Sequence, residues 1–68
     1  MITETTRARI EAAIEADPTR WRTEGGNQNG PRDIVIDGHD LTIGWSQLDK
    51  AYMVFEQMGG GYDLVAEI

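Results

Sequence analysis

The chain has 68 residues, which is the length of one small domain, and we expect a single domain over residues 1–68. It contains no cysteine, which excludes disulfide bonds and thiolate metal sites. The first residues lack the basic start and apolar run of a secretory signal, and no stretch approaches the roughly 18 apolar residues that span a bilayer. We therefore expect a cytoplasmic protein encoded by a complete small open reading frame.

The formal net charge is −6, and it is unevenly distributed along the chain. Residues 1–32 carry five acids and five arginines and sum to zero, whereas residues 33–68 carry seven acids and one base, Lys50. A surface of this kind repels phosphate and attracts basic partners. The charge makes direct nucleic-acid binding unfavourable and favours a protein partner with a basic surface.

Residues 5–17 are predicted to form a helix. Ile10, Ala13 and Ile14 recur at helical spacing, and the intervening residues propagate a helix well. Thr3 or Thr5 can cap its start, and the Asp17-Pro18 pair ends it, because the residue before proline avoids the helical region.

Residues 19–31 are predicted to be a flexible loop, because they are rich in glycine, asparagine and proline. The loop contains an Arg20-Trp21-Arg22 run that could stack on a nucleic-acid base. We favour a different role, in which Trp21 folds back onto the core and the arginines are solvated.

Residues 33–45 are predicted to form a β-hairpin, because Asp37-Gly38 is a two-residue turn suited to positive φ angles. This turn pairs Ile36 with His39, and the register it sets agrees with the alternation of apolar residues. The residues expected on the core face are Ile34, Ile36, His39, Leu41, Ile43 and Trp45.

Residues 47–58 are predicted to form a second helix, with an apolar stripe of Leu48, Ala51, Tyr52, Phe55 and Met58. Ser46 and Asp49 match a capping box, and Gly59 fits the end of a helix. Residues 62–68 alternate as a last strand, with Tyr62, Leu64, Ala66 and Ile68 facing the core.

The predicted fold is therefore α+β in the order α-β-β-α-β. We expect a three-stranded, mainly antiparallel sheet with two helices packed on its isoleucine face. The strand order 2-1-3 is preferred, in which the last strand pairs with the first; pairing of the last strand with the second is the alternative.

No catalytic, cofactor or metal site is predicted. Asp37, His39 and Asp40 lie close in sequence, but neighbouring strand residues point to opposite faces and no second histidine completes a zinc set. The Gly59-Gly60-Gly61 run follows a predicted helix instead of opening one, so it does not form a phosphate loop. We therefore expect a binding protein and not an enzyme.

The candidate partner-binding residues fall into three groups. Four acids are expected together on the sheet face opposite the isoleucines, two valines lie on that same face, and the aromatic–cation pair in the loop is a further interface candidate. The residues are Asp33, Asp40, Asp63 and Glu67; Val35 and Val65; and Arg20 and Trp21.

A small, acidic, cysteine-free chain of this kind is similar in its physical profile to phage-encoded inhibitors such as anti-CRISPR proteins. The resemblance covers length and composition only, and no residue role is transferred from it. It implies an inhibitor that occludes a basic, nucleic-acid-binding surface of a larger protein. The alternative is an assembly module, a homodimer or a small subunit of a complex. Its contacts would be made by apolar residues that a one-sided core does not need, which are Val35 and Val65 on the outer sheet face and Met53 and Val54 beside the helical stripe.

Overall fold

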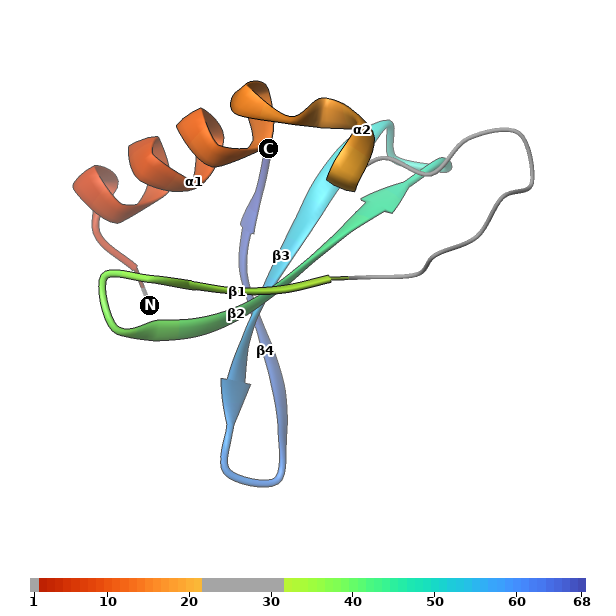
Figure 1. Cartoon of the computed structure of the whole chain (residues 1–68). Coiled ribbons are helices and arrows are strands. Elements are labelled where there is room, and N and C mark those ends of the chain that lie inside the picture. The colour runs from red at the N-terminus through yellow and green to blue at the C-terminus, as the bar shows by residue number, and fades with distance from the viewer. Residues whose placement is uncertain (1, 22–31) are drawn as a thin grey trace.

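One long helix covers one face of a four-stranded antiparallel sheet in the computed structural model, which describes residues 2–21 and 32–68 (Figure 1). The elements are α1 (Glu4–Ala16), α2 (Pro18–Trp21), β1 (Arg32–Ile36), β2 (His39–Ser46), β3 (Ala51–Met58) and β4 (Gly61–Glu67). The predicted α+β class is confirmed, but the sheet has one strand more than expected and the second long helix is absent from the described residues.

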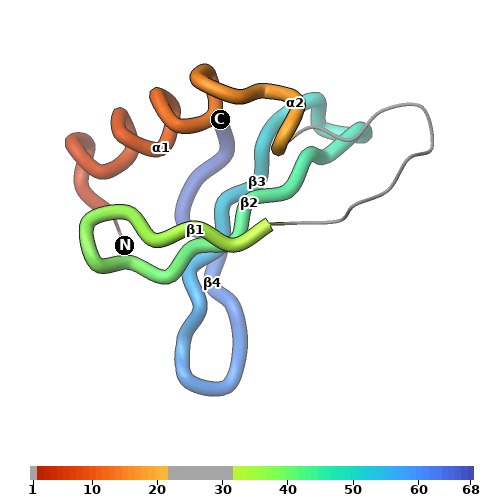
Figure 2. The backbone as a smooth tube through the Cα atoms, in the orientation of Figure 1, coloured from red at the N-terminus to blue at the C-terminus, as the bar shows by residue number. Residues whose placement is uncertain are grey.

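The sheet is a simple meander in the order β1-β2-β3-β4, with every neighbouring pair antiparallel. The tube in Figure 2 follows the chain from each strand straight into the next. We call the face covered by α1 the inner face and the opposite face the outer face. The core between α1 and the inner face consists of Ile10, Ile14, Trp21, Leu41, Ile43, Val54 and Ala66.

Helix α1 begins and ends close to the predicted positions. The Thr3 side chain caps it by accepting a hydrogen bond from the backbone N–H of Thr6 at 3.1 Å. Ile10 and Ile14, one turn apart, bury their side chains against the sheet. The helix ends at Ala16, just before the Asp17-Pro18 pair that disfavours continuation.

The hairpin predicted over 33–45 is confirmed, with Ile36 opposite His39. Asp37 and Gly38 have φ angles of 51° and 80°, so both turn residues adopt the left-handed conformation that this dipeptide favours. Because paired residues in an antiparallel ladder point to the same face, the register places Ile34 and Leu41 together on the inner face.

The predicted helix over 47–58 is wrong, because residues 51–58 form strand β3. Val54, which the helical pattern placed beside the apolar stripe, is fully buried, whereas Leu48, placed within the stripe, is 92% exposed. Strand alternation puts Val54 opposite Ile43 and Ala66 in the middle of the sheet. Burial of this β-branched residue between two strands outweighed the helical spacing of its neighbours.

The capping-box residues do bond to each other, but in a turn between β2 and β3. The Ser46 hydroxyl accepts from the backbone N–H of Asp49 and donates to its carboxylate, each at 3.1 Å. Lys50 follows with a φ of 54°, which reverses the chain instead of starting a helix. Gly59 and Gly60 likewise form a hairpin turn and not a helix end, since Met58 pairs with Gly61.

The last strand is confirmed at Gly61–Glu67, but its position in the sheet differs from the prediction. It pairs antiparallel with β3, because the two-residue Gly59-Gly60 turn joins these two strands as a hairpin. The predicted 2-1-3 order is therefore wrong. The ladder shifts by one residue where Val54 pairs with Ala66 and Phe55 pairs with Leu64. Val65 is the extra residue of this β-bulge.

The segment predicted as a loop from residue 19 instead begins as the short helix α2, and residues 22–31 lie outside the described residues. The prediction that Trp21 folds onto the core is confirmed, since its side chain is 4% exposed and its indole N–H donates to the Ala13 carbonyl at 3.3 Å. None of the described helices is long and apolar enough to cross a membrane.

Candidate protein-binding face

The outer face of the sheet is not covered by either described helix, because α1 and the core lie on the other side (Figure 1). The strand registers determine which side chains it carries. They are Asp33, Val35, Asp40, Thr42, Met53, Phe55, Gln57, Tyr62, Leu64 and Glu67.

Apolar side chains are unusually exposed on this face. Val35 is 65% exposed, Tyr62 67% and Leu64 47%, and Phe55 beside Leu64 is half-buried. Single exposed apolar residues are normal, but these belong to adjoining rows of one sheet. One row runs from Asp33 through Thr42 and Phe55 to Leu64 across all four strands.

The outer face is hollowed where these rows meet. Asp33, Thr42, Phe55 and Tyr62 line an open hollow of about 450 Å³. A second hollow of similar size shares Asp33 with the first and is lined by Asp33, Ile34, Val35, Asp40, Leu41 and Gln57. The sheet therefore offers a concave surface with an apolar side and an acidic side.

Polar side chains fix the floor of the hollow. The Thr42 hydroxyl donates to the Asp33 carboxylate at 2.8 Å, and the Gln57 amide donates to the Thr42 hydroxyl at 3.3 Å. This chain of hydrogen bonds crosses three strands and holds the Asp33 carboxylate against Thr42. A partner would therefore meet a positioned carboxylate beside an aromatic ring.

The charge of the outer face has one sign. Asp33, Asp40 and Glu67 lie on it and are exposed. The described strands contain a single arginine and no lysine, and that residue, Arg32, has the register of the inner face opposite Ile43. The other arginines of the described residues belong to α1 and α2, on the far side of the sheet.

Two of the predicted partner-binding residues do not lie on this face, because the bulge reverses the alternation of β4. Asp63 pairs with Glu56, which contacts His39 on the inner side of the sheet. Val65 is half-buried and packs against the core cluster. The same shift moves Tyr62 and Leu64, which were expected in the core, out to the exposed face.

The aromatic–cation pair is also used within the fold. The Trp21 ring is buried, and the Arg20 guanidinium lies 4.8 Å from the centre of that ring. Trp21 is therefore a core residue that offers no exposed indole for a partner. Sequence reasoning placed Phe55 in the apolar stripe of a helix and therefore missed its position on the outer face. It expected Gln57 to face water, and Gln57 is exposed, although on a strand. What decides for the strand is the burial of Val54, a tertiary effect.

The structure separates His39 from Asp40, its neighbour in the chain. His39 Nδ1 lies 2.6 Å from a Glu56 carboxylate oxygen on the inner face, whereas Asp40 lies on the outer face. No group of three or more histidine, cysteine or acidic side chains in residues 2–21 and 32–68 could hold a metal ion. The His39–Glu56 pair instead bridges β2 and β3 beyond the edge of the apolar core.

Comparison of the chain with protein families, with curated proteins and with solved structures returned no match.

Proposed function

We propose that the chain is an acidic protein-binding inhibitor that covers a basic, nucleic-acid-binding surface of a larger protein with the outer face of its sheet. The observation that carries the proposal is the combination of Asp33, Asp40 and Glu67 with the exposed apolar side chains of Val35, Tyr62 and Leu64 on one concave face that neither described helix covers. Apolar contact supplies affinity, and the carboxylates supply steering and selectivity for a basic partner.

A basic partner is favoured because lysine and arginine side chains would pair with the carboxylates at the rim of the hollow. Protein surfaces that bind nucleic acids carry such basic patches, and an acidic face placed on them competes with the phosphate backbone. The net charge of −6 adds a long-range attraction toward the same kind of surface.

Self-association through the outer face is the alternative, since exposed apolar residues also mark dimer interfaces. Two copies packed face to face would bring the Asp33, Asp40 and Glu67 carboxylates of each into one interface without a basic residue of the described strands to pair with them. Like charges in an interface are unfavourable, so the charge pattern supports a different, basic partner.

The experiment compares two variants with the same change in net charge. D33K/D40K reverses two charges on the outer face, and E11K/E15K reverses two on the solvent side of α1. Each immobilised protein is exposed to a nuclease-treated lysate of the source cell or its host and is eluted along a salt gradient.

The proposal expects wild type and E11K/E15K to retain the same nucleic-acid-handling protein, released by salt, and D33K/D40K to lose it. Retention of that protein by all three forms, or recovery of only the chain itself as a salt-resistant oligomer that D33K/D40K also forms, would overturn the proposal. Folding of each variant is checked by circular dichroism.

A further inference from the structure

We infer that the partner supplies an extended basic segment that adds to β4 as an antiparallel fifth strand along Gly61–Leu64. The edge of β4 that it joins pairs with no other strand of the described residues and is called the free edge. The inference rests on the proposed function and specifies how part of the partner is held. Strand addition combines backbone hydrogen bonds with side-chain contacts on alternating sides of the new strand.

The first observation is the position of the β3–β4 hairpin. Its turn end projects away from α1, past the layer that the helix covers (Figures 1 and 2). Gly61, Tyr62, Asp63 and Leu64 are all exposed although they belong to a strand. Strand residues exposed on both faces at the edge of a sheet form a template for pairing with another chain.

The second observation is the direction of the backbone groups. The two-residue turn makes Met58 and Gly61 a hydrogen-bonded pair, so Gln57 and Tyr62 form the next, non-hydrogen-bonded pair, and Phe55 and Leu64 another. The amide and carbonyl groups of Tyr62 and of Leu64 therefore point to the free edge. Their side chains lie on the outer face, beside Phe55.

The third observation is that the other end of the same edge is closed. Glu67 also directs its carbonyl outward, since Tyr52 and Ile68 exchange the inward hydrogen bonds at 2.8 Å. The Arg7 side chain donates to that carbonyl at 2.9 Å. The bulge at Val65 interrupts the regular ladder between the two ends. The run available to a partner is therefore Gly61–Leu64.

The negative charge of Asp63 favours a basic strand over a second copy of the chain at this edge. In the self-pairing register that uses every outward group, Tyr62 of one copy faces Leu64 of the other, and Asp63 faces Asp63 of the second copy. Directly opposed like charges destabilise a pair of strands. A strand with a lysine or arginine opposite Asp63 has the complementary charge there, and it places apolar residues opposite Tyr62 and Leu64 on the outer face.

The probe is the peptide acetyl-Lys-Val-Lys-Val-Lys-Val-Lys-amide, titrated into the ¹⁵N-labelled chain. In antiparallel pairing the residues opposite Tyr62 and Leu64 share their face and direct their own amides toward β4. The valines therefore form the backbone bonds, and the lysines lie on the side of Asp63. N-methylation of the three valines removes those donors, and N-methylation of the first three lysines removes the same number of donors, which point away.

We expect the amide resonances of Tyr62 and Leu64 to shift and their hydrogen exchange to slow when the unmodified peptide binds. The valine-methylated peptide should bind at least about tenfold more weakly, and the lysine-methylated peptide within about threefold of the unmodified one. Equal binding of both methylated peptides, no binding of any of them, or shifts confined to other strands would overturn the inference.

A variant pair tests the same edge from the side of the protein. L64P removes the outward amide of Leu64, a position where an edge strand tolerates proline, and L64A removes the side chain but keeps the amide. L64P should abolish peptide binding and L64A should only weaken it.

In the lysate capture, loss of the partner with D33K/D40K but not with L64P would leave the outer-face proposal standing and overturn strand addition. Retention by D33K/D40K overturns the proposed function itself.

Discussion

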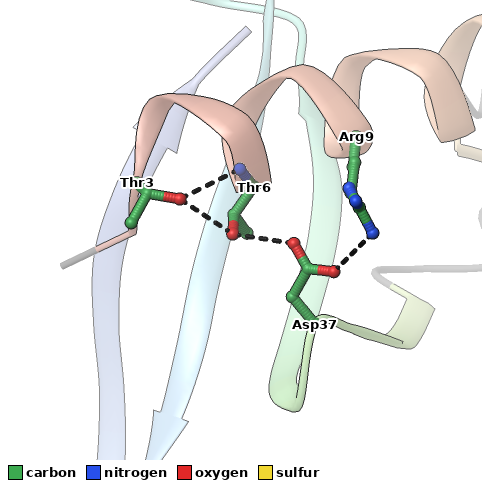
Figure 3. Close-up of polar contacts among 4 residues, drawn as sticks. All are labelled: Thr3, Thr6, Arg9 and Asp37. Carbon is green, nitrogen blue, oxygen red and sulfur yellow. Dashed lines mark hydrogen bonds and ion pairs between the residues drawn. The ribbon is translucent and has the colours of Figure 1, made fainter.

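The hydroxyl group of Thr6 in α1 donates a hydrogen bond to Oδ2 of Asp37 in the β1–β2 turn at 2.9 Å (Figure 3). Arg9 donates to the other carboxylate oxygen of Asp37 at 2.9 Å, and the Thr3 hydroxyl donates to the Thr6 oxygen at 3.1 Å. The Thr6 side chain is buried, so this contact is part of the packed structure. Asp37, which helps to reverse the chain between β1 and β2, therefore also holds α1 over the inner face.

Asp37 should consequently tolerate asparagine better than alanine. Asparagine adopts the positive φ of this position and keeps one acceptor, whereas alanine opposes the φ and removes both acceptors. We expect Asp37→Ala to lower the free energy of unfolding by about 2–3 kcal/mol and Asp37→Asn by about 1 kcal/mol. Urea denaturation measures both, and equal small losses would contradict the role given to this contact.

The strand at 51–58 is tested by a pair of alanine substitutions. Val54→Ala removes buried methyl groups between β2 and β4 and should cost about 2 kcal/mol. Leu48→Ala changes an exposed turn residue and should alter stability by no more than about 0.5 kcal/mol. A helix over 47–58 predicts the reverse order, so a larger loss for Leu48→Ala in denaturant titrations would contradict strand β3.

The turn between β3 and β4 is tested by a second pair of alanine substitutions, at Gly59 and Gly60. Gly60 has a φ of 114°, and no other atom occupies the space that a Cβ would fill, so Gly60→Ala has a purely backbone cost of about 1–2 kcal/mol. Gly59 has no such φ and an equally open site, so Gly59→Ala should be neutral or stabilising by up to about 1 kcal/mol. Thermal unfolding of the two variants distinguishes these effects, and a greater loss at Gly59 would argue for a helix end there.

The two valines proposed from the sequence as surface contacts should behave differently. Val65→Thr introduces a hydroxyl at the edge of the core and should cost about 1–2 kcal/mol. Val35→Thr lies on the exposed outer face and should change stability by less than about 0.5 kcal/mol. Equal effects on chemical denaturation would show that the bulge does not turn Val65 inward.

The part of the fold that could be predicted is the part in which two independent signals agree. For residues 33–45, the turn chemistry of Asp37-Gly38 and the apolar alternation specify the same register. For residues 47–58, Tyr52, Phe55 and Met58 fit a helical stripe, while Tyr52, Val54 and Glu56 fit a strand. The sequence alone did not favour the strand, because what decides it is the burial of Val54 between β2 and β4, a tertiary effect.

The candidate site was predictable to the same extent. Asp33, Val35 and Asp40 belong to the correctly predicted hairpin, and they do lie on the outer face. Asp63 and Val65 were misplaced because a single bulge residue reverses the faces of β4 between Leu64 and Ala66. No composition or spacing rule applied to this sequence marks that residue, so the exposure of Tyr62 and Leu64 became apparent only from the structure.

The most direct test of the outer-face proposal is a competition measurement on the captured partner. A fluorescently labelled oligonucleotide is bound to that partner and displaced by increasing concentrations of the chain. The account predicts that wild type and E11K/E15K displace it equally well, and that D33K/D40K needs at least about tenfold more protein because its outer face now repels a basic surface. Equal displacement by D33K/D40K, or binding of the chain and the oligonucleotide together, would contradict the proposal that the outer face occludes a nucleic-acid-binding surface.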